Sequence, residues 1–213
     1  MLLKFISYLS KLTAVVSCMA ASANTLPDLP EPVSNNAVAA VTIRGKTYVA
    51  SFMGIGQGKQ YSDIHNKVFM HTLGDFGWHE MPDVPSQQRL KGRIAASAVA
   101  LKQQLYMMGG RKVGAGNLAL LQRFDPALSQ WQQLAPMPQA SGGLAAAALG
   151  QHILVFGGEY FDNDGGVYAP VWQYDAAADS WQQQGSMPLP RHGLGAVTLN
   201  NKVYVLGGAT EAG

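Results

Sequence analysis

The segment Gln104-Leu-Tyr-Met-Met-Gly-Gly110 decides the fold, because its pattern returns twice further along the chain. The second copy is His152-Ile-Leu-Val-Phe-Gly-Gly158 and the third is Lys202-Val-Tyr-Val-Leu-Gly-Gly208, at intervals of about 50 residues. An apolar run that ends in a glycine pair is typical of a strand followed by a turn, since glycine accepts the positive φ that other residues disfavour. A period of this length predicts an architecture of repeated units.

Further features recur at fixed places around these segments. Runs of small and apolar residues precede the three copies, over residues 94–101, 144–149 and 194–199. An aromatic-Asp pair, a tryptophan and a proline follow each of the first two, as Phe124-Asp125, Trp131 and Pro138 and as Tyr174-Asp175, Trp181 and Pro188. The runs predict strands buried on both faces, the aspartates predict turns, and the prolines end a fourth strand. Four short antiparallel strands per unit predict a blade of a β-propeller.

The N-terminal part of the repeat is weaker, although Trp78 and Pro85 keep the spacing. There Ser51-Phe52 stands in the predicted place of the glycine pair. The sequence therefore predicts a signal peptide (1–23), a Pro-rich lead-in (24–32) and a degenerate blade (33–85). Two regular blades (86–138 and 139–188) and half of a further blade (189–213) follow. The predicted fold class is all-β, an incomplete propeller ring of about three and a half four-stranded blades.

An open arc leaves an apolar face and strand edges uncovered, which favours aggregation. One expectation is therefore that the 213 residues are a fragment of a chain of roughly 350 residues, or about seven repeat units. A second is that two arcs assemble into one ring as a dimer. A third is a truncated and inactive product.

The first 23 residues have the pattern of a secretory signal peptide. Lys4 and Lys11 precede an apolar stretch from Leu12 to Ala20, and Ala21-Ser22-Ala23 follows it as a small-residue cleavage site. The mature chain is therefore predicted to be exported and to begin at Asn24. The apolar stretch is too short to span a bilayer. In an alternative interpretation, Cys18 is the lipidated first residue of a lipoprotein. It is the one cysteine of the chain, so no disulfide framework is expected.

Composition excludes several functional classes. Charged residues make up 13% of the chain and glycine accounts for 24 residues, which argues against disordered and long-helix proteins. The net charge of +2 comes from the two lysines of the predicted leader. A neutral mature protein has no electrostatic attraction for nucleic acid or anionic membranes. No metal site and no cofactor are expected.

The glycine pairs, aromatic residues and tryptophans at these spacings resemble the kelch repeat over residues 33 to 208. The resemblance implies a propeller, which in this family has six or seven blades. In kelch propellers of the substrate-adaptor type, an arginine sixteen residues before the glycine pair and another directly after it line the channel mouth and bind acidic groups. The matching residues here are Arg93, Arg191 and Arg111, while Ser141 and Asn35 occupy the first position in the other two units. In the alternative interpretation, Arg93 and Arg191 cap strands and pair with a neighbouring blade.

The longest insert, Glu159 to Tyr168, contains two other candidates. Asp162, Asp164 and Gly165 partly match a calcium loop but lack the remaining ligands, so a solvated turn is favoured. The aromatic residues of the insert are expected either to stack on a sugar or to pack under the loop. The five histidines show no paired metal spacing, and only His192, beside Arg191, is placed at the expected channel mouth.

Two classes of function remain. The first is a non-enzymatic propeller that presents a ring face to a protein or carbohydrate ligand. The second follows from a looser similarity to the periplasmic N-acetylneuraminate epimerases, or sialic acid mutarotases. That reaction needs a general acid and base, for which Glu159 and His192 are the candidates. Galactose-oxidase-like propellers have the same architecture, but their copper radical site needs a cysteine, and the mature chain has none unless Cys18 is kept at its N-terminus. This activity is therefore not expected.

Overall fold

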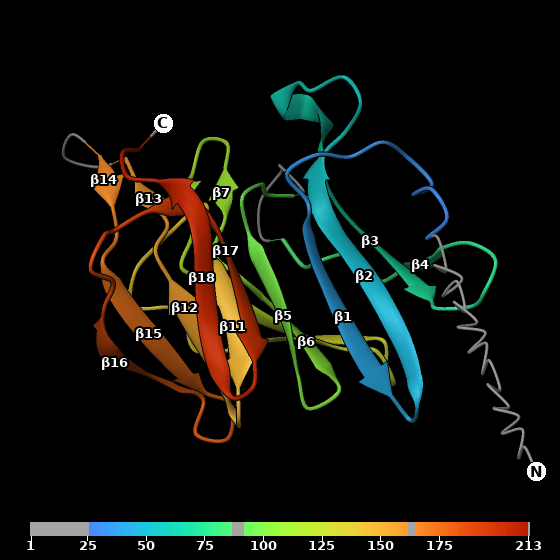
Figure 1. Cartoon of the computed structure of the whole chain (residues 1–213). Coiled ribbons are helices and arrows are strands. Elements are labelled where there is room, and N and C mark those ends of the chain that lie inside the picture. Colours follow the sequence, from blue (N-terminus) through green and yellow to red (C-terminus); the bar gives the residue numbers. More distant parts are fainter. Residues whose placement is uncertain (1–25, 87–91, 162–164, 213) are drawn as a thin grey trace, which may run out of the picture.

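The computed structural model describes residues 26–86, 92–161 and 165–212, and antiparallel sheets account for nearly all of its regular structure (Figure 1). Blade 1 contains, in order, β1 (Ala37–Ile43), β2 (Lys46–Ile55), β3 (Ile64–Thr72) and β4 (His79–Met81). Blade 2 contains β5 (Ser97–Leu101), β6 (Gln104–Met108), β9 (Leu121–Asp125) and β10 (Gln130–Gln133). A 3-10 turn, η1 (Tyr61–Asp63), lies between β2 and β3.

Blade 3 repeats this order with β11 (Ala145–Leu149), β12 (His152–Phe156), β15 (Pro170–Asp175) and β16 (Ser180–Ser186). Blade 4 has two described strands, β17 (His192–Leu199) and β18 (Lys202–Ala209). Two short hairpins extend blades 2 and 3, namely β7 (Arg111–Lys112) with β8 (Gly116–Asn117), and β13 (Glu159–Tyr160) with β14 (Gly166–Val167).

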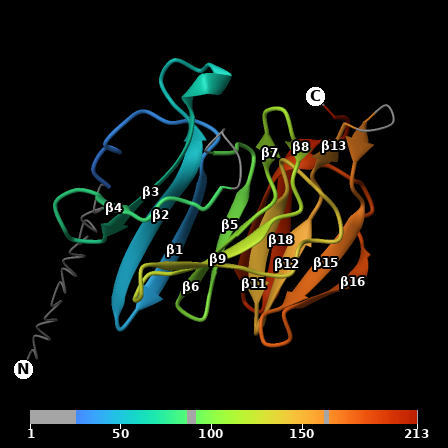
Figure 2. The same ribbon diagram turned by 180° about the vertical axis from the view of Figure 1, so that it is seen from behind.

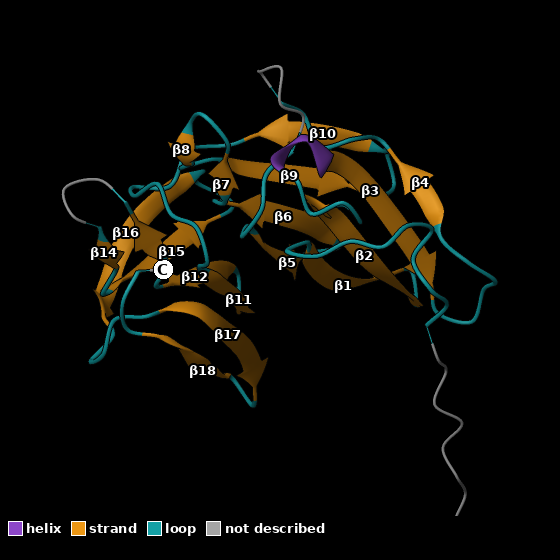
Figure 3. Ribbon diagram, turned by 90° about the horizontal axis from the view of Figure 1, so that it is seen from above, coloured by secondary structure: helices purple, strands orange, loops and turns teal. Residues whose placement is uncertain are grey.

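The blades stand side by side as an open arc, which Figure 3 shows from above. The first strand of every blade, β1, β5, β11 or β17, lies on the inner side and contacts its neighbour, while β4, β10 and β16 lie on the outer side (Figure 3). One apolar core fills the space between blades 1 and 2, and another fills the space between blades 2 and 3. The predicted fold, an incomplete all-β propeller of about three and a half blades, is confirmed.

The repeated aspartates and tryptophans have the same contacts in successive blades. Asp125 Oδ1 accepts hydrogen bonds from the backbone amides two and three residues later, as does Asp175 Oδ1, which confirms the predicted turns. Trp131 Nε1 donates to the carbonyl of Pro82 in the preceding blade at 2.9 Å, and Trp181 repeats this contact with Ala135. The tryptophans therefore join each blade to the one before it.

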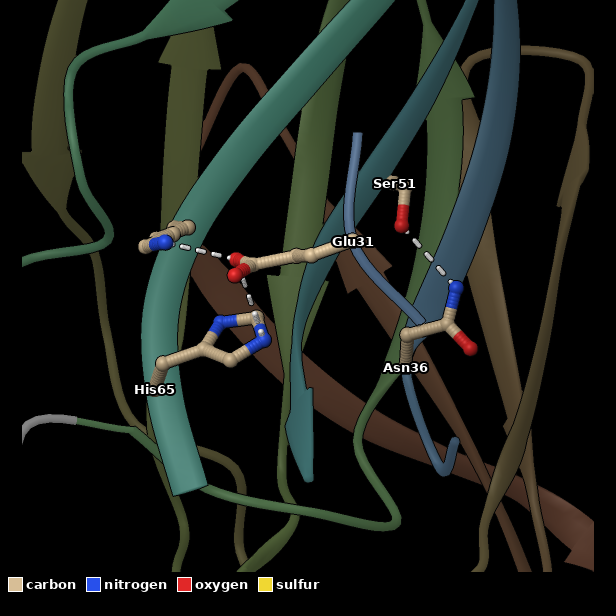
Figure 4. A network of polar contacts seen from close by, with 5 residues as sticks. Glu31, Asn36, Ser51 and His65 are labelled. Atoms are coloured by element: carbon tan, nitrogen blue, oxygen red, sulfur yellow. Dashed lines mark hydrogen bonds and ion pairs between the residues drawn. The ribbon is translucent and has the colours of Figure 1, made fainter. Parts of the chain in front are cut away.

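The Pro-rich segment before β1 is joined to blade 1 in the same way. Trp78 Nε1 donates to the carbonyl of Pro27 at 2.9 Å. Further along the segment, the Glu31 carboxylate lies 2.7 Å from Lys67 Nζ and 3.9 Å from His65 Nε2 (Figure 4). Partial burial lowers the pKa of His65, and the Glu31 carboxylate opposes this effect. These contacts hold the segment against β3.

The glycine-pair position of blade 1 differs from the sequence prediction. Positive φ angles fall on Met53 (52°) and Gly54 (118°), as they do on the glycine pair of blade 2 (61° and 97°). Ser51 and Phe52 lie within β2 and are buried. The prediction was wrong because the β1–β2 hairpin has seven residue pairs and the β5–β6 hairpin has five, which lengthens the spacing in blade 1.

This longer hairpin also corrects the predicted counterpart of Arg93 in blade 1. A Cβ atom added to Gly110 would lie 3.1 Å from Arg93 Cδ, and one added to Gly54 would lie 2.5 Å from Val33 Cγ2. Val33, rather than Asn35, therefore takes the place of the arginine. Blade 1 has an apolar side chain where blades 2 and 4 have a cation.

The strands of blade 4 are less buried than their apolar composition suggests. The run over residues 194–199 was predicted to be buried on both faces, but Val197 is 50% exposed and Leu199 is 58% exposed. Leu206 on β18 is also exposed. The prediction is wrong for this run because, among the described residues, no further blade packs against β17 and β18.

Candidate functional site

The hairpins that contain β7, β8 and β13 lie at the same face of the arc (Figures 1 and 2), and side chains from three successive blades contact one another there. We define the rim cluster by five residues, Arg111, Asn117, Glu159, Phe161 and His192. Arg111 and Asn117 come from the hairpin after the second strand of blade 2, and Glu159 and Phe161 follow the second strand of blade 3. His192 is the first residue of β17 in blade 4. The repeat positions them because the loop after each glycine pair emerges at the same end of its blade.

Glu159 and His192, the two predicted catalytic candidates, lie together in this cluster. Glu159 Oε2 is 3.3 Å from His192 Nδ1, so the carboxylate of blade 3 contacts the imidazole of blade 4. Glu159 is 8% exposed, and Asn117 Nδ2 of blade 2 donates to its backbone carbonyl. A carboxylate in contact with an imidazole can bind a polar ligand or transfer a proton.

Arg111 lies on the exposed side of the same cluster. Its guanidinium carbon is 4.1 Å from the centre of the Phe161 ring, a cation–π contact between the hairpins of blades 2 and 3. Tyr160 and Tyr168 contact each other with ring centres 4.8 Å apart, and the Tyr168 hydroxyl donates to the carbonyl of Ala140. Of the two predicted roles for these aromatic residues, packing within the insert is the one that the described contacts match.

Arg191 is bound to its own blade. Its Nη1 donates to the carbonyl of Gly207, the first glycine of the pair in blade 4, at 2.6 Å. This contact matches the alternative in which the arginine caps a strand. The residue is partly exposed.

Arg93 has a different environment from both Arg111 and Arg191. It is 4% exposed and lies between blades 1 and 2, where its Nη1 donates to Gln122 Oε1 at 2.8 Å. Burial lowers the pKa of Arg93 to about 10, so it remains charged at neutral pH. The three arginines predicted to line one channel mouth are therefore in three separate settings.

Arg93 lines a cavity of about 360 Å³ together with Lys112, which is 6% exposed. Lys112 Nζ donates to Ser86 Oγ at 2.8 Å, and burial together with the charge of Arg93 lowers its pKa. The remaining wall is mainly apolar and includes Met53, Val84, Leu118, Leu120 and Trp131. We call this space the interblade cavity.

Sequence reasoning missed Lys112 and Gln122. Lys112 follows the predicted Arg111 directly, but a lysine after a turn is normally solvated, and only the packing of blade 1 buries it. Gln122 does carry a sequence signal, because it precedes Phe124 by two residues on β9 and therefore shares the buried face of that strand.

The other residues that the sequence suggested as candidates do not form a site among the described residues. Asp162 and Asp164 of the partial calcium loop lie outside the described residues, and Gly165 directly precedes β14. Within residues 26–86, 92–161 and 165–212, no three His, Cys, Asp or Glu side chains are grouped as metal ligands. The predicted leader and Cys18 also lie outside the described part. In the part of the chain that is described, no helix has the length and apolar character needed to cross a bilayer.

Comparison with known proteins identifies the repeats. Residues 17–212 match the family model described as the KLHDC2/KLHL20/DRC7 Kelch-repeats domain. Beta-scruin of Limulus polyphemus is 29% identical over 103 residues, which cover 48% of this chain and 11% of that protein. Kelch-like protein terF of Aspergillus terreus is 28% identical over 143 residues, or 63% of this chain and 29% of the relative.

A mouse protein, Kelch-like protein 38, is 27% identical over 128 residues, which cover 60% of this chain and 21% of its own length. The matched region is thus less than a third of each of these three relatives.

Proposed function

Because this chain belongs to the kelch-repeat family, we propose that it is a propeller that binds a protein partner through the rim cluster. The observation that carries the proposal is the exposed Arg111–Phe161 pair together with the Glu159–His192 pair, in which Glu159 is buried and His192 is partly exposed. Arginine and aromatic side chains dominate the binding energy of many protein interfaces. Loops that a rigid scaffold positions are also the usual place for recognition.

Contacts between blades order the loops of the rim cluster before a partner binds. Asn117 donates from blade 2 to the Glu159 carbonyl of blade 3, and Glu159 in turn contacts His192 of blade 4. Loops that are already ordered lose less conformational entropy when a partner binds. Of the two functional classes derived from the sequence, a binding propeller needs only these features.

A peptide-display selection on the immobilised protein tests this proposal. Peptides selected by the wild-type chain should bind Arg111→Ser/Phe161→Ser at least 10-fold more weakly, because the exposed anchors are lost. The matched control is Arg44→Ser/Phe76→Ser. Its two residues lie in the β1–β2 and β3–β4 connections, at the opposite end of blade 1, and should change the Kd by less than 2-fold. Equal losses in both variants, or no loss at the rim, would contradict the proposal.

Sialic acid mutarotation is the second candidate, because the Glu159 carboxylate and the His192 imidazole are 3.3 Å apart beside an arginine. The same preparations test it, by NMR measurement of anomer exchange in N-acetylneuraminate. Under the binding proposal the wild-type chain leaves the exchange rate at its uncatalysed value. Acceleration that His192→Asn abolishes would replace the binding proposal with the enzyme.

We also propose that the protein is exported, to the periplasm or the extracellular space, as the pattern of residues 1–23 indicates. The intact mass of the protein produced in a secreting host is expected to correspond to a chain that starts at Asn24. A lipid-modified chain that starts at Cys18 would support the lipoprotein alternative instead. A chain that retains Met1 would contradict export through a cleaved leader.

A further inference from the structure

Lys112 places an amine against the interblade cavity. Successive side chains of a strand alternate between its faces, so on β7 Arg111 is exposed and Lys112, at 6% exposure, faces inward. The Lys112 Nζ is held by its 2.8 Å hydrogen bond to Ser86 Oγ. Lysine is almost never buried in proteins without a charged partner. In the described part of the chain Lys112 forms no ion pair, and no carboxylate lines this cavity.

A second cation lies beside Lys112, and the protein does not neutralise it. Arg93 is 4% exposed, and its Nη1 donates to Gln122 Oε1 at 2.8 Å. Its Nε and Nη2, which form one edge of the guanidinium, are buried and have no hydrogen-bond partner among the described residues. Loss of hydration and the positive charge of Arg93 both lower the pKa of Lys112. Both effects favour the neutral amine, which is the nucleophilic form of lysine.

The space around Lys112 has room for a small molecule. The interblade cavity has a volume of about 360 Å³, and Leu118, Leu120 and Trp131 form part of its apolar wall. Lys112 also lines a second hollow of about 270 Å³, together with Tyr61 and Arg111. Tyr61 is 65% exposed, so this second hollow lies at the protein surface. A small molecule can therefore approach the lysine from solvent and place an apolar group in the cavity.

From these observations we propose that Lys112 is the nucleophile of a covalent site that binds an aldehyde with an apolar stem as a Schiff base. A lysine that is desolvated in an apolar pocket, or placed next to another cation, is a common form of activated amine. The apolar wall contacts the stem of the aldehyde. This site is separate from the rim cluster, so it goes beyond the proposed function and can fail or succeed independently of it.

The reaction is a condensation and consumes no oxidant or reductant. The lone pair of the neutral Nζ forms a bond to the carbonyl carbon, and the π electrons of the C=O bond move to the oxygen. The nitrogen releases its two protons, the oxygen takes up two, and it leaves as water while the C=N bond forms. The products are therefore the imine and one molecule of water.

Reductive trapping with hexanal tests the site. The folded protein is incubated at pH 7 with a limiting amount of hexanal and sodium cyanoborohydride, which reduces an imine to a stable secondary amine, and mass spectrometry of peptides locates the product. Lys102, an exposed lysine in the β5–β6 turn, is the internal control. Lys112 should be alkylated about 10-fold faster than Lys102 or more, because more of its amine is neutral and the cavity holds the stem. Equal or slower alkylation of Lys112 would overturn the proposal.

Two further conditions separate the cavity from the lysine itself. With acetaldehyde, which lacks four methylene groups of hexanal, the ratio of the Lys112 rate to the Lys102 rate should be roughly 10-fold smaller, because little stem is buried. In guanidinium chloride, which unfolds the chain, the ratio for hexanal should fall to about one, since both lysines are then hydrated. Equal ratios for the two aldehydes would contradict the stem contact, and a ratio that survives unfolding would contradict a site made by the fold.

Arg93→Gln tests the second cation, because glutamine removes the charge and can still bond to Gln122. The ratio of the Lys112 rate to the Lys102 rate should fall, since the pKa of Lys112 then returns toward its usual range. Arg44→Gln, at an exposed arginine in the β1–β2 turn, is the matched control and should leave the ratio unchanged. Circular dichroism shows whether each variant folds. If Arg93→Gln does not fold, the wild-type ratio still decides the proposal, whereas an unchanged ratio in the folded variant would overturn the role of Arg93.

Discussion

Phe124→Ala is expected to lower the free energy of unfolding by about 3–5 kcal/mol, the usual cost of truncating a fully buried phenylalanine. The Phe124 side chain is 0% exposed and its ring centre lies 4.9 Å from that of Trp131. Trp131 also contacts Phe52 of blade 1, with ring centres 6.0 Å apart. The substitution therefore leaves a cavity within blade 2 and loosens its contact with blade 1. Urea unfolding followed by tryptophan fluorescence measures the loss.

Phe76→Ala is the matched control, because this residue loses the same atoms from a position that is 108% exposed in the β3–β4 connection. It should change the free energy of unfolding by less than about 0.5 kcal/mol, as is usual for surface substitutions. Similar losses in both variants would mean that Phe124 is not part of a packed core. That outcome would contradict the propeller arrangement of blades 1 and 2.

The second large effect is expected from Gly109→Ala, at about 2–5 kcal/mol of destabilisation from left-handed strain and overpacking combined. Gly109 has a φ of 61°, and a Cβ at this position would lie 2.6 Å from the Ser141 carbonyl oxygen of blade 3. The same atom would lie 2.3 Å from Leu144 Cδ2. The adjacent amide of Gly110 donates to the Ser141 carbonyl at 2.8 Å, so the backbone cannot move away without losing this bond between blades.

Gly150→Ala separates the two causes of destabilisation, left-handed backbone strain and overpacking. Gly150 has nearly the same φ, 62°, but lies in an open turn where a Cβ would meet nothing within 4 Å. This variant should lose only the strain energy, about 1–2 kcal/mol. Chemical denaturation of the two variants side by side gives the difference, which is the cost of the close approach between blades. If the two losses are equal, the contact between blades 2 and 3 at Gly109 is looser than described.

Sequence reasoning identified two residues of the candidate site, Glu159 and His192, but not the contact between them. Both were candidates for the general acid and base, and the structure places their side chains in contact. Their role in binding or catalysis stays a prediction. The sequence could not predict the contact itself, because it joins residues from consecutive blades, and the angle between blades depends on the packing of the core between them.

Arg93 is the opposite case. The repeat assigned it the same position as Arg191, yet one is buried in a cavity and the other bonds to a carbonyl of its own blade. The difference arises from the neighbours, since Arg93 donates to Gln122 on β9, the third strand of its own blade, whereas blade 4 has no third strand among the described residues. Identical repeat positions therefore have different electrostatic environments according to what stands beside them.

The sequence by itself determined the repeat, the four-stranded unit, its turns and the all-β class, because these depend on local periodicity and on the backbone preferences of glycine, proline and aspartate. Tertiary structure alone decided the register of blade 1, where the longer β1–β2 hairpin gives the left-handed turn to Met53-Gly54. It also decided the burial of Lys112 and the unpartnered edge of Arg93. Burial and charge pairing depend on residues from the neighbouring blade, which spacing along one chain does not specify.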